Sequence, residues 1–314
     1  MKDILIVGTG ALATFFAARL SQVGYSITML GSWKNGLEAL RQEGARLIDS
    51  AGVAYSFNVH AISDPREYRG VRQALVLVKA WQTEQVAEQL KECLAEDGLV
   101  VSFQNGLGNR EMLARSLGWS RVALGTTTTG ATLLGPGLVR EGGEGVVSVE
   151  RNQGLRALEE ALRSAKFNVQ VVEDAQSLVW GKLVINAAIN PLTALLRVPN
   201  GKLLELPSAH ELMKALALET AQVAQAETVT LPFPDPVAAA EEVARKTSAN
   251  YSSMLQDVLR GAPTEIDAIC GAVVKLGQTH KMETPANRAC WKLVKAMGDQ
   301  KKPKKGHFRT LAPT

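Results

Sequence analysis

The chain opens with Ile4-Leu5-Ile6-Val7-Gly8-Thr9-Gly10-Ala11-Leu12-Ala13, a short apolar run followed at once by two glycines. The run predicts a buried parallel strand, residues 13–24 have helical spacing with a glycine at the stop, and residues 25–30 predict a second strand. In such a βαβ unit Gly8 allows the tight turn, Gly10 lets backbone N–H groups approach a pyrophosphate, and Ala13 permits close packing of helix on strand. We therefore expect a dinucleotide site, rather than a purely structural turn, at Gly8, Thr9, Gly10, Ala11, Leu12 and Ala13.

The end of the second strand indicates which dinucleotide binds. An NAD site places an Asp or Glu there for the ribose 2′-hydroxyl, but this chain reads Leu30-Gly31-Ser32-Trp33-Lys34. A hydroxyl and a cation suit a 2′-phosphate, so we predict NADP(H), with Ser32 and Lys34 as phosphate ligands. The alternative is that Lys34 only decorates the start of a helix.

Further apolar runs extend this unit into an α/β domain. Strands are predicted at 74–78, 99–103, 121–127, 145–149 and 168–172, a helix at 153–165, and a hairpin at 46–48 and 54–57. Lys79 and Asn105 follow two of these strands, and ligands of open parallel sheets lie beyond the carboxyl ends of strands. The sequence thus predicts a Rossmann-type domain in which Lys79 and Asn105 face the cofactor.

The second half of the chain changes from strand to helix patterns. Helices are predicted at 175–195, 208–228, 236–247, 252–260, 263–280 and 285–298. We therefore predict three regions: a nucleotide-binding domain at 1–173, an all-helical substrate domain at 174–300 and a basic tail at 301–314.

A thread of polar side chains runs along the first of these helices. Lys182, Asn186 and Asn190 are four residues apart in an otherwise apolar segment, and a helix places them on one face. Buried amides and an ammonium need partners or a wet pocket, so the thread is either a polar ladder between helices or a pocket wall. Pro191 disfavours a helical conformation at Asn190, which predicts a helix end or kink there.

More polar residues follow downstream. Asn250 precedes the predicted helix at 252–260, Ser252 or Ser253 is the candidate N-cap at its start, and Glu265 and Asp267 lie in the first turn of the next helix. Alone they are explained as helix caps and first-turn carboxylates. Together with the polar thread they suit an anionic substrate, with Lys182 as proton donor and Glu265 as its orienting partner.

Composition excludes several functions. The net charge is only +4, and a solvated tail explains the lysines after residue 300 better than a nucleic-acid or lipid site. Three scattered cysteines and four histidines show no disulfide or metal spacing. We expect no signal peptide and no segment near the roughly 20 apolar residues of a membrane span. The expected location is the cytoplasm, with no metal, nucleic acid or membrane partner.

Taken in order, the motifs of this chain resemble the ketopantoate reductase (2-dehydropantoate 2-reductase) family. The resemblance spans nearly the whole chain and rests on these segments: Gly8-x-Gly10-Ala11-Leu12-Ala13, Val78-Lys79-Ala80-Trp81-Gln82-Thr83, Gln104-Asn105-Gly106-Leu107-Gly108, Gly125-Thr126-Thr127-Thr128, Trp180-x-Lys182-Leu183-x-x-Asn186-x-x-x-Asn190-Pro191-Leu192-Thr193-Ala194, Pro199-Asn200-Gly201, Asn250-x-Ser252-Ser253-Met254-Leu255-Gln256-Asp257 and Thr264-Glu265-Ile266-Asp267.

The resemblance implies reduction of 2-dehydropantoate to pantoate by NADPH, on the route to pantothenate and coenzyme A, with a homodimer as the candidate assembly. By position, Lys182 matches the family's proton donor. Its substrate contacts match Asn186, Asn190, Asn200, Asn250 and Ser253. Its cofactor contacts match Lys79, Asn105, Ala131 and Glu265, and Glu265 also matches a position near the reacting centre.

Two other functions fit the residues. One keeps the chemistry and changes the substrate to another small 2-oxo acid, because anion-binding amides are not uniquely selective. The other is a non-catalytic NADP-sensing protein whose basic tail contacts a partner, and it predicts cofactor binding without turnover of any substrate.

Overall fold

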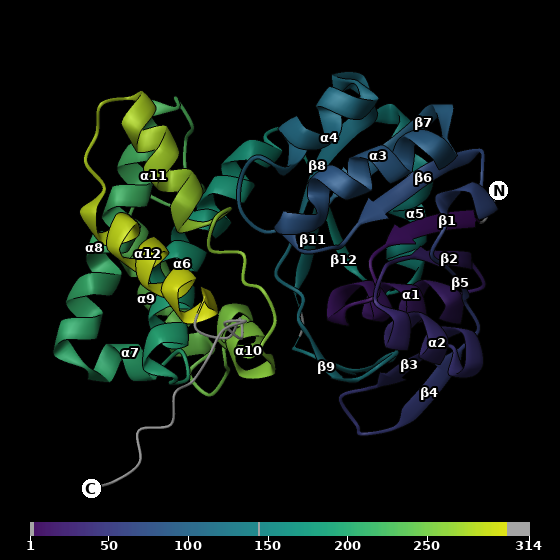
Figure 1. Ribbon diagram of the computed structural model, residues 1–314, viewed down its shortest axis with the longest axis horizontal. Helices are drawn as coiled ribbons and strands as arrows, with labels where there is room; N and C mark the ends of the chain where they lie inside the picture. The colour runs from purple at the N-terminus through teal and green to yellow at the C-terminus, as the bar shows by residue number, and fades with distance from the viewer. Residues whose placement is uncertain (1–2, 144, 300–314) are drawn as a thin grey trace, which may run out of the picture. The chain divides into compact units, whose positions relative to one another are not determined.

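The computed structural model describes residues 3–143 and 145–299, which form two compact units (Figure 1). The first unit runs from the N-terminal strand to Leu183 and includes Val229–Pro232, and the second comprises Val184–Thr228 and the described residues from Phe233 onward. The predicted basic tail at 301–314 lies outside the described residues.

The first unit is built on an eight-stranded sheet in the order β12-β11-β8-β7-β6-β1-β2-β5. Neighbouring strands are parallel except β8 and β11, which are antiparallel. The strands are β1 (Asp3–Val7), β2 (Ser26–Leu30), β5 (His60–Ile62), β6 (Val71–Val76), β7 (Leu94–Ser102), β8 (Val122–Thr127), β11 (Val146–Glu150) and β12 (Asn168–Val172). Their order confirms the predicted Rossmann-type sheet, which ends at the predicted last strand.

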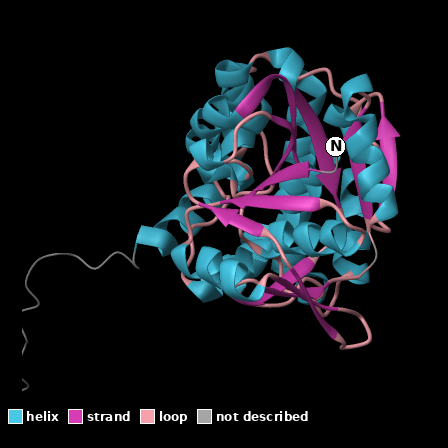
Figure 2. Cartoon of the chain, turned by 90° about the vertical axis from the view of Figure 1, so that its right-hand side faces the viewer, coloured by secondary structure: helices cyan, strands magenta, loops and turns pink. Residues whose placement is uncertain are grey.

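Helices cover both faces of this sheet because its strands are apolar on both faces (Figure 1, Figure 2). In β1, Ile4 and Ile6 join the core that contains α1 (Ala11–Gln22) and α5 (Arg156–Ser164). Leu5 and Val7 join the core of α3 (Thr83–Cys93) and α4 (Asn109–Leu117). Helix α2 (Lys34–Glu43) follows β2 and contacts β5.

A second sheet of four strands has the order β4-β3-β10-β9. The predicted hairpin is confirmed as antiparallel β3 (Ala45–Ile48) and β4 (Ala54–Phe57). Strands β9 (Ala131–Gly135) and β10 (Leu138–Glu141) complete this sheet and were not predicted, since both are short and lie among glycines. β5 was also missed, because three residues carry no periodicity.

The second unit is helical, as predicted. Besides the later part of α6 (Ala175–Leu196), it contains α7 (Lys202–Glu205), α8 (Pro207–Ala226), α9 (Pro236–Lys246), α10 (Ser253–Arg260), α11 (Cys270–Thr279) and α12 (Pro285–Asp299). The four-residue α7 was not predicted. The boundary between the two units falls inside α6, between Leu183 and Val184.

The predicted helix at 263–280 begins only at Cys270, so the first-turn positions assigned to Glu265 and Asp267 are wrong. Residues 265–269 form turns instead, in which the Glu265 carbonyl accepts hydrogen bonds from the amides of Ala268 and Ile269. Glu265, Ile266 and Ile269 are all buried, so packing of these side chains overrides the local helix propensity.

Of the two alternatives predicted at Asn190, a helix end or a kink, the helix end is wrong, because α6 continues through Pro191 to Leu196. A proline inside a helix costs about 3 kcal/mol, whereas burying one large aliphatic side chain contributes about 1.5–3 kcal/mol. Ile189 and Leu192, on either side of the proline, are both buried, so packing offsets that cost. The helix stops beside Arg197, whose φ of 56° is left-handed.

Helix α6 is an exception to the expectation that no segment approaches the length of a membrane span. Its 22 residues are long and apolar enough to cross a membrane by length and composition alone. However, 67% of the qualifying window is buried inside the protein, which is the behaviour of a core helix.

Candidate functional site

The turn between β1 and α1 has the geometry of a pyrophosphate cradle. Gly8 has φ of 133°, and a Cβ there would lie 3.0 Å from the Leu77 carbonyl oxygen and 3.3 Å from the Ala13 Cβ. Gly10 is the N-cap of α1, where no side chain caps the helix, and a Cβ there would meet nothing within 4 Å. The first turn of α1 carries no acidic residue. Open space before an uncapped helix N-terminus fits the anionic part of a dinucleotide.

The residues predicted to hold a 2′-phosphate lie at the end of β2. Ser32 and Lys34 are both exposed, and Lys34 is the first residue of α2. Between them, Trp33 packs its ring over Gly36, where an added Cβ would clash with the ring atom Cε3. A cation at a helix N-terminus opposes the helix dipole, so Lys34 does not serve to stabilise α2. Its position suits an anionic ligand better.

Lys79 and Asn105 lie in the two segments that follow β6 and β7. These strands are parallel neighbours, and β6 also pairs in parallel with β1, so the Gly8 turn, Lys79 and Asn105 follow strand ends on one edge of the sheet. Both segments turn sharply, and Gly106 and Gly108 have φ of 81° and 87°. The structure therefore places the Gly8 turn, Lys79 and Asn105, all predicted to contact a cofactor, at one edge of the sheet.

Lys182 reaches the same edge from helix α6. Its Nζ donates a 2.8 Å hydrogen bond to the carbonyl oxygen of Thr127, the last residue of β8. Because β8 is parallel to β7, its carboxyl end lies on the edge that carries Lys79 and Asn105. Thr127 lies in one of the segments that carry the family resemblance and ends a predicted strand, but no role was predicted for its carbonyl. The ammonium of Lys182 is thus anchored beside the strand ends within the first unit.

Two predicted polar segments of the second unit lie against each other. The backbone amide of Asn200 donates to the Asn250 carbonyl at 3.0 Å, and its Nδ2 donates to the Thr247 hydroxyl at 2.9 Å. The Asn200 Oδ1 atom is buried and has no hydrogen-bond partner among the described residues. A buried amide oxygen without a partner is costly, so it is a candidate acceptor for a ligand donor.

A pair of hydroxyls links α6 to the start of α10. The Thr193 and Ser252 hydroxyls lie 2.7 Å apart, and Thr193 also donates to the Asn190 carbonyl at 3.0 Å. Ser252 is the N-cap of α10, so the exposed Ser253 is its first residue. This pair fixes the segment that carries Asn250 and Ser253 to α6 beside Asn190.

Three further residues predicted for the site, Asn186, Glu265 and Ala131, lie on or next to α6, α11 and β9. Asn186 shares the α6 face of Lys182 one turn away, and Glu265 is buried in the turn before α11. Ala131 begins β9, shortly after β8 ends. Among residues 3–143 and 145–299, no group of three or more His, Cys, Asp or Glu side chains could hold a metal ion.

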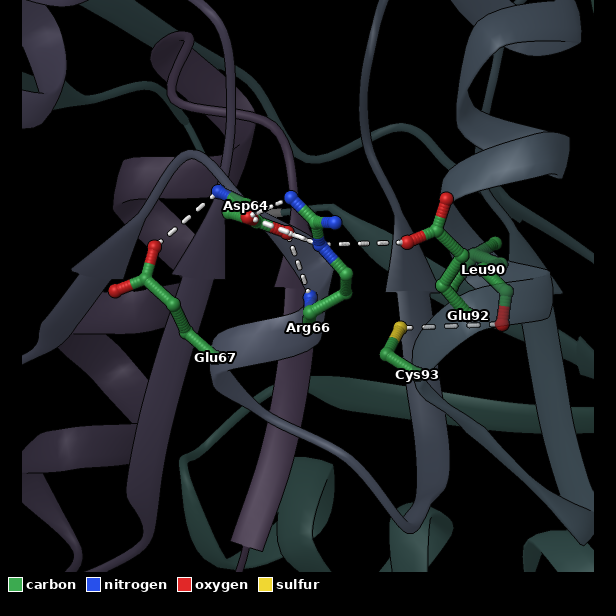
Figure 3. Close-up of polar contacts among 6 residues, drawn as sticks. All are labelled: Asp64, Arg66, Glu67, Leu90, Glu92 and Cys93. Carbon is green, nitrogen blue, oxygen red and sulfur yellow. Dashed lines mark hydrogen bonds and ion pairs between the residues drawn. The ribbon is translucent and has the colours of Figure 1, made fainter.

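A separate polar cluster lies around Asp64, where Arg66 pairs with the Asp64 carboxylate at 2.7 Å and with Glu92 at 3.8 Å (Figure 3). The hydrogen bond from the Arg66 side chain lowers the pKa of Asp64 to about 2. Burial raises the pKa of the neighbouring Cys93 thiol to about 11. An exposed ion pair and a protonated thiol offer neither a base nor a nucleophile, so this cluster is structural.

Known proteins resemble this chain along almost its full length. Residues 4–154 match the family described as ketopantoate reductase PanE/ApbA, and residues 174–298 match its C-terminal domain. A 2-dehydropantoate 2-reductase of Archaeoglobus fulgidus is 36% identical, with 95% of this chain and 98% of the relative covered.

Solved structures agree with this similarity. The PanE/ApbA family ketopantoate reductase of Ralstonia eutropha is 30% identical, with a TM-score of 0.88 over 95% of this chain and 99% of its own. A D-mandelate dehydrogenase solved with NADH and anilino(oxo)acetate has a TM-score of 0.89 over 95% of this chain and 99% of its own. At 24% sequence identity, this match shows a shared fold only. By these matches, the chain belongs to the ketopantoate reductase family of dinucleotide-dependent oxidoreductases.

Proposed function

We propose that this protein reduces 2-dehydropantoate to pantoate with NADPH, in the cytoplasm and on the route to pantothenate and coenzyme A. The observation that carries the proposal is the Lys182 ammonium, hydrogen-bonded at the carboxyl end of β8 on the edge that carries the glycine turn. Family membership and the names of the relatives support the substrate.

The proposed chemistry needs one proton donor. NADPH, when bound, supplies a hydride to the ketone carbon of the substrate. Lys182 stabilises the negative charge that develops on the ketone oxygen and then donates the proton. The Thr127 carbonyl accepts one of the three ammonium hydrogens and so orients the group. Glu265 is proposed to hold Lys182 in the orientation for proton transfer.

The helical region at 174–300 is proposed to bind the substrate. Amides at Asn186, Asn190, Asn200 and Asn250 and the Ser253 hydroxyl suit a carboxylate with a neighbouring hydroxyl, and their role is orientation. On the cofactor side, Ser32 and Lys34 are proposed to bind the 2′-phosphate, and Lys79, Asn105 and Ala131 to contact the rest of the cofactor. The glycine turn from Gly8 to Ala13 is proposed to hold the pyrophosphate.

The test is NADPH oxidation with 2-dehydropantoate and a panel of other small 2-oxo acids, repeated with NADH. We expect 2-dehydropantoate and NADPH to give the highest kcat/KM. In Lys182→Ala, kcat should fall by about 10²- to 10⁴-fold while NADPH binding persists, because the lost group acts on the reacting oxygen. The exposed Lys91, which pairs with Glu88 on its own helix, provides the control variant Lys91→Ala.

Full turnover in Lys182→Ala would overturn the assigned mechanism. Preference for another 2-oxo acid would change the substrate while keeping the chemistry. Binding of NADPH without turnover of any acid would instead favour a sensing protein.

A further inference from the structure

A buried chain of hydrogen-bonded side chains lies between the segments that follow β6 and β7. The Ser102 hydroxyl donates to Oε1 of Gln104 at 3.0 Å, and Nε2 of Gln104 donates to the Thr83 hydroxyl at 2.7 Å. The Thr83 hydroxyl lies 2.8 Å from Oδ1 of Asn109 and 2.8 Å from the Ala80 carbonyl oxygen, the two acceptors for its proton. Thr83 is fully buried and Asn109 is 4% exposed.

This series of hydrogen-bonded side chains ends on backbone atoms of the two loops that follow β6 and β7. Nδ2 of Asn109 donates to the Asn105 carbonyl at 3.0 Å and lies 3.5 Å from the Gly106 carbonyl oxygen. At the other end, the Ala80 carbonyl belongs to the residue after Lys79. Thr83 therefore joins the backbone beside Lys79 to the backbone of Asn105 through side chains that have little contact with solvent.

The positions of Thr83 and Asn109 explain why these contacts act on the loops. Thr83 is the first residue of α3 and Asn109 the first of α4, so each stands where a loop enters a rigid helix. The loop before α4 contains Gly106 and Gly108 at positive φ, which glycine adopts without strain, and glycines leave a loop backbone with many accessible conformations. Inward hydrogen bonds to the Asn105 and Gly106 carbonyls restrict that freedom.

We propose that Thr83 is a positioning residue of the cofactor site, which sets the relative placement of Lys79 and Asn105 through Gln104 and Asn109. This inference rests on the proposed function, because it assumes that Lys79 and Asn105 contact NADPH. Without the hydroxyl, Nε2 of Gln104 and Oδ1 of Asn109 lose a buried partner. A buried polar group without a partner is costly, so both side chains shift to find new ones and displace the two loops.

The test is the dissociation constant for NADPH, measured by calorimetry well below the unfolding temperature. Thr83→Val keeps the shape and removes the hydroxyl, and we expect NADPH binding to weaken by about tenfold, since one lost buried contact of this kind is worth that factor. Thr83→Ser keeps the hydroxyl and should bind within about twofold of the wild type, a difference smaller than the loss of one hydrogen bond.

The matched control is Thr220→Val. Thr220 is also fully buried, but its hydroxyl donates to the Leu216 carbonyl of its own helix, α8, in the second unit. A purely structural role for Thr83 predicts that both valine variants lower the unfolding temperature and leave the NADPH dissociation constant unchanged. A positioning role for Thr83 predicts a larger NADPH dissociation constant in Thr83→Val and no change in Thr220→Val.

A double-mutant cycle shows whether Thr83 acts through Lys79. If it does, Lys79→Ala weakens NADPH binding less in the Thr83→Val background than in the wild type, whereas additive effects would contradict the inference. Asn109→Asp gives a second route if Thr83→Val does not fold, because it keeps an acceptor for Thr83 and loses the donor to the Asn105 carbonyl.

The outcomes separate this inference from the proposed function. A wild-type protein that binds no NADPH overturns both. A wild-type protein that binds and turns over NADPH, with Thr83→Val and Asn109→Asp binding it equally well, overturns the positioning role alone.

Discussion

At the scale of single residues, the two glycines of the first turn are required for different reasons. Gly8 has a left-handed φ of 133° and approaches the Leu77 backbone, so the fold itself excludes a side chain there. Gly10 has φ of −85° and open space where a Cβ would point. The fold tolerates a side chain at Gly10, and only a ligand at the helix N-terminus would exclude one.

We therefore predict that two alanine variants fail in different ways, one in stability and the other in NADPH binding. Gly8→Ala should lower the free energy of unfolding by about 1–3 kcal/mol, the usual cost of a strained backbone conformation. Gly10→Ala should unfold like the wild type in urea and bind NADPH several-fold more weakly, because the new methyl group fills the cradle. Normal NADPH binding in a folded Gly10→Ala protein would argue against a pyrophosphate at this turn.

At the scale of elements, the start of α12 shows how a helix can be capped from a distant part of the chain. Thr284 directly precedes Pro285 and is a residue type that often caps helices, yet its buried hydroxyl has no hydrogen-bond partner among the described residues. Instead the Glu219 carboxylate of α8 accepts hydrogen bonds from the backbone amides of Ala286 and Asn287 at 2.8 and 2.9 Å. It also accepts one from Nδ2 of Asn287 at 2.9 Å.

This arrangement predicts that Glu219→Ala destabilises the protein and that Thr284→Val does not. Removing the carboxylate leaves three donors without their acceptor, and we expect a loss of about 1–3 kcal/mol in urea unfolding. Thr284→Val removes a hydroxyl that has no hydrogen-bond partner among residues 3–143 and 145–299, so stability should stay the same or rise. A larger loss in Thr284→Val than in Glu219→Ala would show that the cap is local.

At the scale of the whole molecule, the three cysteines report on global unfolding. Cys93, Cys270 and Cys290 are all buried free thiols. Burial raises the pKa of Cys93 and Cys290 to about 11 and that of Cys270 well above its ordinary value of 9.0. All three are therefore protonated and shielded in the native protein at neutral pH.

The raised pKa values set the direction of a pH effect on stability. Well below pH 9, the ordinary pKa of these thiols, they are protonated in both the native and the unfolded state and contribute no pH dependence. Between pH 9 and about 11 the unfolded chain loses these protons first, so stability falls as pH rises. Other groups also titrate in this range, so the thiol contribution is measured as a difference from the wild type. The urea midpoint of Cys93→Ala should fall less steeply with pH than that of the wild type, because one of the thiols with a raised pKa is absent.

The same burial predicts slow labelling. A disulfide reagent at pH 8 should react slowly with the native protein and rapidly with three thiols per chain in guanidinium. A thiol that labels quickly in the native state would contradict its burial.

The sequence alone was sufficient wherever local chemistry decides structure. The glycine turn, the apolar strands that precede Lys79 and Asn105, and most helices of the second unit were predictable, because period, composition and turn residues are local properties. The same holds for the Ser252 cap of α10, which needs only its own helix. Family membership was also predictable, since the ordered motifs span nearly the whole chain.

Only the tertiary structure decided features that depend on distant partners. Helix α6 continues through Pro191 and α11 starts late at Cys270 because buried neighbours outweigh local propensity. Strands β9 and β10 exist because they pair with each other and β10 pairs with the distant β3. The anchoring of Lys182 on Thr127, the capping of α12 by Glu219 and the hydrogen bonds of Thr83 each join residues far apart in the chain. The physical reason is that periodicity shows which face of an element is buried, but not which polar group it will meet there.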